Sequence, residues 1–192
     1  MSLPAPLLLE AYRRGLFPMA LPDGSIRWFS PDPRGILPLD RFHVPRRLER
    51  VIRQARFDVR VDCAFHDVIR ACADVDETWI SPVIVEVYGE LHRLGVAHSV
   101  EAWREGQLVG GLYGVSLGGA FFGESMFHRV ADASKVALQA LVERLRRRGY
   151  GLLDVQWVTP HLSTFGAIEV SRREYLQLLR DSLRLQRHFT EN

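Results

Sequence analysis

Apolar and polar positions alternate through much of the second half of the chain, with glycine turns between the alternating runs. Alternation with a period of two, interrupted by glycine, is typical of antiparallel strands joined by tight turns. Such strands are predicted over residues 98–103, 107–117 and 120–127, and another over residues 152–158. The pattern therefore predicts an antiparallel meander, followed by a long helix and one more strand.

Helical spacing of apolar residues is found on both sides of this meander. It predicts helices over residues 7–14, 65–72, 82–94, 133–148 and 171–185, and basic residues with near-helical spacing predict one within residues 43–56. Ser81 is a good N-cap, and Pro82 after it fits the first helical position. Asp132 is expected to cap the long helix, which Gly149 ends.

Two further segments complete the predicted fold. Residues 57–61 alternate as a strand, and residues 18–38, rich in proline and glycine, predict an ordered loop. Helices packed on a mostly antiparallel sheet make an α+β protein. This pattern resembles the acyltransferase fold of the Gcn5-related N-acetyltransferase superfamily. We place a boundary near His98, between a small, loop-rich α+β N-terminal domain, residues 1–97, and an acyltransferase-like catalytic domain, residues 98–192.

Composition limits the class of protein. With 192 residues, 47% of them hydrophobic, the chain can bury a full core. No run of about 18 apolar residues is present, which predicts a cytosolic protein without a membrane span. Cys63 and Cys72 stand apart from any cysteine or histidine cluster, so we expect packing residues rather than a metal or redox site.

The basic residues are unusual in kind rather than in number. The net charge is only +2, yet Lys135 is the only lysine and the other positively charged residues are arginine. The alternatives are a compositional bias of the genome and the use of planar guanidinium groups to bind phosphates. Five of these residues recur with near-helical spacing: Arg46, Arg47, Arg50, Arg53 and Arg56. They leave a similar choice, between a solvated helix face and contact with RNA phosphates.

A carboxylate and an amide mark the strand predicted after the long helix. Asp154 and Gln156 are two residues apart, so both side chains point to the same face. Apolar neighbours indicate a buried strand, where a carboxylate needs a partner. Asp154 is therefore expected either to pair with an arginine or to face Glu124, in a site where two carboxyl groups perturb each other's pKa. Gln156 cannot titrate and can only orient a partner.

Apolar residues on these strands and on the long helix could meet in one place. They are Leu112, Phe121, Met126, Leu138, Leu141 and Leu145. Such a stripe is commonly plain core, but the glycines at 110, 111, 114, 118 and 119 could leave room for a ligand. Ser125 lacks the second glycine of a nucleophile elbow, so covalent serine catalysis is not expected.

Several blocks of the sequence form a specific combination, although each is weak alone. They are Tyr12–Pro18, Trp28–Arg34, Thr78–Ile80, His98–Trp103, Gly110–Gly114, Gly123–Phe127, Ala133–Lys135, Leu153–Gln156 and Gly166–Arg173. On these blocks the chain resembles the bacterial leucyl/phenylalanyl-tRNA–protein transferase family, in the family's order and over nearly the whole length. The resemblance implies an enzyme that moves leucine or phenylalanine, with methionine as a further donor, from aminoacyl-tRNA to the α-amino group of proteins beginning with arginine or lysine. This reaction feeds N-degron protein degradation.

The resemblance implies roles for particular side chains. Asp154 and Gln156 flank the reacting amine, and Glu124 helps to shape the acceptor site. Trp79 lies where the terminal adenosine of tRNA is held, and Met19 stands there in place of a tryptophan that many members carry. The pocket for the donor side chain is built from Leu112, Phe121, Met126, Leu138, Leu141, Leu145 and Leu153. Within it, leucines at 141 and 145 replace bulkier aromatic residues, which predicts a wider pocket.

The resemblance also implies partners. Four arginines cluster at the end of the long helix, Arg144, Arg146, Arg147 and Arg148, where they either complement the helix dipole or bind tRNA phosphates. No metal or organic cofactor is needed, because an aminoacyl ester is already activated. We expect a cytoplasmic monomer that binds aminoacyl-tRNA and proteins or peptides with N-terminal arginine or lysine. We expect no membrane contact and no extension ahead of the first helix.

Two other functions compete with this hypothesis. An acetyl-CoA-dependent N-acetyltransferase on the same fold needs a glycine-rich turn that offers backbone N–H groups to pyrophosphate, and residues 127–133 contain no glycine. A non-catalytic RNA-binding adaptor has no evident need for Glu124, Asp154 and Gln156 together. The sequence therefore favours an aminoacyltransferase.

Overall fold

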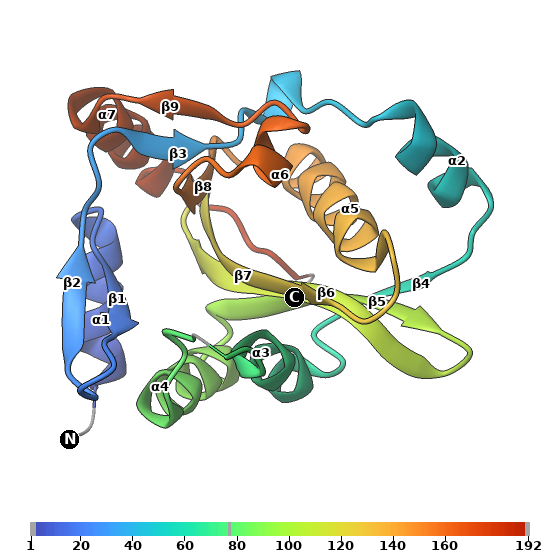
Figure 1. The fold of residues 1–192 in the computed structure, drawn as a ribbon. Coiled ribbons are helices and arrows are strands. Elements are labelled where there is room, and N and C mark those ends of the chain that lie inside the picture. Colours follow the sequence, from blue (N-terminus) through green and yellow to red (C-terminus); the bar gives the residue numbers. More distant parts are fainter. Residues whose placement is uncertain (1–2, 77, 191–192) are drawn as a thin grey trace.

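Seven strands form one sheet in the computed structural model, which describes residues 3–76 and 78–190. They are β3 (Arg34–Ile36), β4 (Asp58–Val61), β5 (Ala97–Arg104), β6 (Gln107–Leu117), β7 (Ala120–His128), β8 (Leu152–Gln156) and β9 (Ile168–Val170). Their order across the sheet is β4-β5-β6-β7-β8-β3-β9. β7 and β8 are parallel, and the other neighbouring pairs are antiparallel. The predicted α+β fold and the meander β5-β6-β7 are therefore confirmed (Figure 1).

Helices cover both faces of the sheet. α5 (Ala133–Arg148) lies on one face, and α3 (Phe65–Ala73) and α4 (Pro82–Arg93) lie on the other (Figure 1). Successive strand residues point to opposite faces. Leu112 accordingly packs in the core beneath α5, whereas Tyr113 packs in the core with α3 and α4. The sheet thus separates two hydrophobic cores, and a buried residue of a strand packs in one core or the other.

The segment predicted as an ordered loop, residues 18–38, contains strands. β1 (Phe17–Ala20) and β2 (Ile26–Phe29) form an antiparallel hairpin, and β3 enters the main sheet between β8 and β9. The loop prediction was wrong because β3 has three residues, too few for alternation to be recognised. A Cβ atom at Gly35 would lie 2.7 Å from the carbonyl carbon of Trp157, so the close approach of these two backbones requires glycine.

Helix ends follow the predicted signals in most places. Further helices are α1 (Ala5–Arg13), α2 (Arg46–Arg53), α6 (Pro160–Ser163) and α7 (Arg172–Leu183), with a 3₁₀ turn at Leu39–Arg41. Ser81 caps α4 as predicted, because its hydroxyl accepts the N–H of Ile84 at 3.5 Å. Gly149, at φ 70°, ends α5. The predicted cap at Asp132 was wrong: among the described residues its carboxylate accepts a hydrogen bond from Lys135 Nζ at 2.8 Å instead.

Other expectations concern exposure and boundaries. Cys72 is buried, but Cys63 is exposed between β4 and α3, so the expectation that both cysteines pack in the core was wrong for Cys63. β4 pairs with β5 across the boundary predicted near His98, and the boundary itself stays a prediction. Within the described ranges, the helices are too short or too polar to cross a membrane.

Candidate active site

A buried glutamate and a buried aspartate lie on neighbouring strands. β7 and β8 run parallel, with Phe122 opposite Asp154. Glu124 follows on β7 as the extra residue at a shift in register between β6 and β7. A bulge of this kind redirects a side chain and bends the strand. Burial raises the pKa of Glu124, and the charge of Asp154 raises it further.

Glu124 is bound by two tyrosines. Tyr12 of α1 donates its hydroxyl hydrogen bond to Oε1 at 2.6 Å, and Tyr88 of α4 donates to Oε2 at 3.2 Å. The two hydroxyl groups also contact each other. Burial raises the pKa of Glu124 from its ordinary 4.5 to about 8, although both hydrogen bonds and the charge of Arg34 act in the opposite direction. The carboxyl group can therefore gain or lose a proton near neutral pH.

Asp154 pairs with an arginine, which is one of the two alternatives that the sequence left open. Its Oδ1 accepts Arg34 Nε at 3.0 Å, and its Oδ2 accepts Arg34 Nη2 at 2.7 Å. The hydroxyl of Tyr175 donates to Oδ2 at 2.7 Å, and the backbone N–H of Gln156 donates to Oδ1 at 2.9 Å. Both charged side chains of this pair are almost completely excluded from solvent. Each carboxylate oxygen of Asp154 thus accepts two hydrogen bonds, which hold the side chain in one position.

Arg34 is one of the residues of this site that the sequence did not point to. It lies on the short strand β3, and its Nη1 also donates to the carbonyl oxygen of Gly15 at 3.0 Å. Its guanidinium carbon lies 4.8 Å from the ring centre of Phe17 and 4.4 Å from that of Tyr175. Burial opposes its charge, but Asp154 outweighs this and raises the pKa of Arg34. Its place in the shared block Trp28–Arg34 was the available signal.

The end of β8 turns sharply at Gln156. This residue has φ 59°, a left-handed conformation that non-glycine residues seldom adopt. Its N–H is held by Asp154, and the next N–H, of Trp157, donates to the carbonyl oxygen of Val155 at 2.7 Å. The Arg34–Asp154 pair therefore fixes the backbone that presents Gln156 and Trp157. Both of these residues face cavities beside Glu124.

The first cavity, of about 290 Å³, contains most of the predicted donor pocket. Its wall includes Leu112, Met126, Leu138, Leu141 and Leu153 from the predicted set. Phe121 and Leu145 belong to the same core but are fully buried outside the lining. Glu124, Gln156, Thr159 and His161 add polar groups to the apolar wall. Burial lowers the pKa of His161, which favours its neutral form. The cavity therefore combines an aliphatic body with a few polar groups.

A second, smaller cavity of about 90 Å³ adjoins the first, and Glu124, Gln156 and Trp157 line both. Its other walls are Phe17, Met19 and Trp79, so the two residues predicted to hold adenosine lie together. The backbone joins them as well, because the N–H of Ala20 donates to the carbonyl oxygen of Trp79 at 3.2 Å. Within residues 3–76 and 78–190, no group of three or more His, Cys, Asp or Glu side chains could hold a metal ion.

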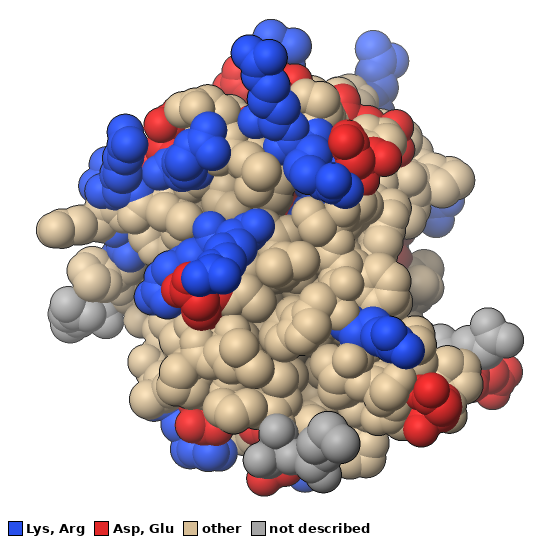
Figure 2. Space-filling model, turned by 90° about the vertical axis from the view of Figure 1, so that its left-hand side faces the viewer, with Lys and Arg blue, Asp and Glu red and all other residues tan. Residues whose placement is uncertain are grey.

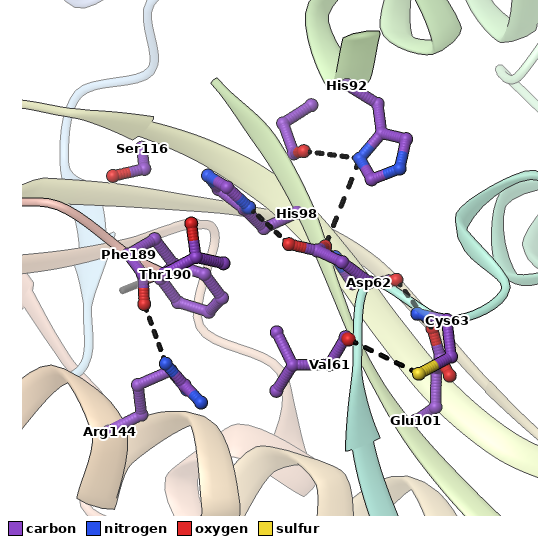
Figure 3. A network of polar contacts seen from close by, with 12 residues as sticks. Val61, Asp62, Cys63, His92, His98, Glu101, Ser116, Arg144, Phe189 and Thr190 are labelled. Atoms are coloured by element: carbon purple, nitrogen blue, oxygen red, sulfur yellow. Dashed lines mark hydrogen bonds and ion pairs between the residues drawn. The ribbon is translucent and has the colours of Figure 1, made fainter. Parts of the chain in front are cut away.

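The predicted arginine cluster lies elsewhere. Arg144, Arg147 and Arg148 line an open cavity of about 550 Å³ at the end of α5, together with Gln186, Arg187 and His188. Arg146 points away and donates to the carbonyl oxygen of Leu39. Figure 3 shows Arg144 donating to the carbonyl oxygen of Phe189, at 2.7 Å. The structure thus brings three of the four arginines together, partly as supports for the C-terminal segment.

Comparisons with known proteins identify the family to which the chain is similar. A family model described as leucyl/phenylalanyl-tRNA protein transferase matches residues 36–180, and the model of that family's N-terminal domain matches residues 1–32. The transferase of Rubrobacter xylanophilus is 57% identical over 190 residues, covering 98% of this chain and 100% of the relative. That of Gloeobacter violaceus is 58% identical over 180 residues, covering 93% of each.

One solved structure, a ribosomal-protein-alanine N-acetyltransferase from Brucella melitensis biovar Abortus, matches with a TM-score of 0.40 and 15% identity, covering 63% of this chain and 90% of that one. The two transferases named above each match over 93% or more of this chain. The chain therefore belongs to the leucyl/phenylalanyl-tRNA–protein transferase family of aminoacyltransferases.

Proposed function

We propose that this protein moves leucine or phenylalanine, with methionine as a further donor, from aminoacyl-tRNA to the α-amino group of proteins that begin with arginine or lysine. The observation that carries the proposal is the pair of adjoining cavities, one aliphatic and one aromatic, that share Glu124 and Gln156. Two reacting groups bound on either side of this shared wall would meet beside a titratable carboxyl group.

The donor side chain occupies the first cavity. Its volume of about 290 Å³ and its leucine and methionine walls suit an unbranched, branched or aromatic apolar side chain. The leucine and methionine part of the wall offers no partner for the charge of a charged donor side chain. The aminoacyl ester then points toward Gln156 and Glu124, and the nucleoside attached to it points toward Trp79 and Met19 in the second cavity.

The chemistry requires alignment and the movement of one proton. The acceptor's α-amino group has a pKa of roughly 8, close to the pKa of about 8 that burial gives Glu124. Proton transfer between groups of matched pKa costs little free energy. The neutral amine attacks the ester carbonyl carbon, the C–N bond forms, and the ester bond to the ribose oxygen of the tRNA breaks. We therefore assign to Glu124 acceptance of the proton that the nitrogen loses and its delivery to the departing ribose oxygen, and we assign orientation of the amine to Gln156. Asp154 acts through the backbone of Gln156, because its own oxygens are already occupied by Arg34, Tyr175 and Gln156.

The acceptor's first side chain is cationic, and a buried carboxyl group beside the amine favours it. An arginine or lysine near Glu124 would stabilise the ionised carboxylate, since an opposite charge within a few ångströms lowers a carboxyl pKa. Selection for a basic first residue and activation of the amine thus use the same group. The products are substrates for N-degron degradation, and the enzyme works as a cytoplasmic monomer.

The tRNA body is held by phosphate contacts. We assign these to Arg144, Arg147 and Arg148, which line an open cavity, whereas Arg146 donates to the carbonyl oxygen of Leu39. Figure 2 shows another face of the molecule, where positively charged side chains lie beside acidic ones. At the end of α7, Arg184 lies 3.9 Å from Asp181. Such mixed charge favours a solvated surface over phosphate binding.

The test is a transfer assay. Labelled leucyl-tRNA and phenylalanyl-tRNA are offered with a peptide that begins with arginine, and a peptide that begins with alanine is the control acceptor. Transfer to the arginine peptide is expected from both donors. Arginyl-tRNA and acetyl-CoA are offered in parallel, and activity with either of these alone would contradict the proposal.

Charge reversal tests the tRNA contact. Arg147→Glu combined with Arg148→Glu is expected to raise KM for charged tRNA and to reduce the slope of log KM against log salt by about one for each lost phosphate contact. Thermal unfolding should change little. Arg93→Glu, in the last turn of α4, is the matched control and should leave KM unchanged. An unaltered salt dependence in the double variant would exclude phosphate contact at this site.

A further inference from the structure

Trp157 is a large aromatic side chain that remains 42% exposed although it directly follows the buried Gln156. Single exposed hydrophobic residues are common on protein surfaces and need no explanation. Trp157 differs because it belongs to the lining of both cavities, at the wall that they share. Trp157 therefore lies where a donor side chain in the first cavity would join the rest of the donor molecule.

The backbone fixes this tryptophan. Asp154 holds the N–H of Gln156, Gln156 turns the chain with φ 59°, and Trp157 donates its own N–H to Val155. On the other side β3 lies so close that a Cβ at Gly35 would be 2.7 Å from the carbonyl carbon of Trp157. The buried Arg34–Asp154 pair and the close approach of Gly35 thus fix the backbone of Trp157, to which the indole is attached.

Neighbouring rings fix the plane of the indole. Phe17 lies 5.2 Å from it between ring centres at an interplanar angle of 90°, and Phe29 lies 6.5 Å from it at 66°. Edge-to-face contacts of this kind orient an aromatic ring. The indole is therefore held in one plane by its neighbours while a large part of its surface stays open to a ligand.

We propose that Trp157 stacks on the terminal base of the aminoacyl-tRNA, on the wall shared by the two cavities. This inference rests on the proposed function. The donor amino acid and the terminal ribose are joined by one ester, so a side chain in the first cavity places the nucleoside beside the shared wall. In the second cavity Met19 offers no aromatic ring, and Trp157 supplies a ring facing the same space as Trp79. Stacking on an aromatic side chain suits a planar base.

The test uses two non-hydrolysable probes, phenylalanine joined by an amide to 3′-amino-adenosine and to 3′-amino-cytidine. Trp157→Ala is expected to weaken binding of the adenosine probe on the order of tenfold and binding of the cytidine probe less, because the smaller base stacks less well. Trp157→Phe should keep part of the difference. KM for phenylalanyl-tRNA should rise in parallel while thermal unfolding remains cooperative.

Trp28→Ala is the matched control, because Trp28 is similarly exposed, at 37%, but lies outside the linings of both cavities. It should leave both probes unaffected. Unchanged binding in Trp157→Ala, or equal weakening of the two probes, would overturn the stacking role, and equal weakening would instead make Trp157 a wall of the donor pocket. If the parent enzyme transfers from neither leucyl-tRNA nor phenylalanyl-tRNA, the proposed function fails and this inference fails with it.

Discussion

Asp154 and Glu124 are buried carboxyl groups on neighbouring strands, and the protein surrounds them with opposite kinds of partner. Asp154 receives two N–H groups of Arg34, the hydroxyl of Tyr175 and a backbone N–H. Among the residues that the structure describes, the donors to Glu124 are the hydroxyls of two tyrosines, and Glu124 lines both cavities. The first carboxylate is neutralised by a bound cation, and the second has its pKa raised to about 8.

The difference shows that burial alone does not determine how a carboxyl group behaves. The groups that donate hydrogen bonds to it determine this as well. A guanidinium group that makes two hydrogen bonds compensates the charge of a carboxylate and holds it in one orientation. Hydroxyl donors stabilise the charged form less, so burial raises the pKa by more than they lower it, and the group titrates near neutral pH. An ion-paired carboxylate and a titratable carboxyl group therefore lie on neighbouring strands, and each can be removed separately.

Removal of the cation should have the largest effect. Arg34→Leu leaves Asp154 buried without its counter-charge, and we expect the free energy of unfolding to fall by about 3–5 kcal/mol. Urea unfolding followed by circular dichroism measures it. Arg93→Leu, an exposed arginine at the end of α4, is the control and should change stability by less than about 0.5 kcal/mol.

A double variant separates the lost ion pair from lost packing. Arg34→Leu with Asp154→Leu removes both charges, and part of the lost stability should return, because an apolar pair of similar volume needs no counter-charge. Transfer activity should stay low in the double variant, since the N–H of Gln156 has lost its acceptor. Full activity in that variant would show that Asp154 does not position Gln156.

Titration of Glu124 should give the next largest effect. Its pKa is raised from 4.5 to about 8 in the folded protein, so between these values the folded state binds more protons than the unfolded state. Stability contributed by this group is therefore present at low pH and is lost as pH rises through this window. The unfolding free energy of the parent minus that of Glu124→Gln should decrease from pH 5 to pH 8. A difference independent of pH would contradict the raised pKa.

The tyrosine hydroxyls should have the smallest effect. Tyr12→Phe removes a donor 2.6 Å from Glu124, and we expect a loss of about 1 kcal/mol together with a further rise in the pKa of Glu124. Tyr88→Phe, whose hydrogen bond is longer at 3.2 Å, should shift the pKa less. The midpoint of the pH–stability curve of each variant measures both shifts. A reversed order would show that the shorter contact is not the stronger one.

Local pattern was enough to predict the meander and α5, because alternation and helical spacing repeat over many residues. The strand predicted over residues 152–158 ends at Gln156, where the backbone turns with φ 59°. Local pattern was not enough for β3, which has three residues. Arg34 and Asp154 are 120 residues apart in sequence, and Tyr12 and Glu124 are 112 apart, so no local signal links them. The sequence stated an arginine partner for Asp154 as one alternative, but only the arrangement of strands identifies which arginine.

The predicted donor pocket also shows what local sequence pattern cannot determine. Five of its seven predicted residues line the cavity, whereas Phe121 and Leu145 are buried outside that lining. Periodicity identifies the face on which a residue lies, but the depth at which a cavity stops depends on packing between β7, β8 and α5. Trp157 was missed for a related reason, because its exposure depends on the left-handed turn at Gln156.

Infrared spectroscopy of the carboxyl groups tests the central contrast most directly. A protonated carboxyl band should be present in the folded parent near pH 6, disappear as pH rises with a midpoint of about 8, and be absent from Glu124→Gln. A parent without this band near pH 6, or a band that persists in Glu124→Gln, would contradict the account, because another group would then carry the proton.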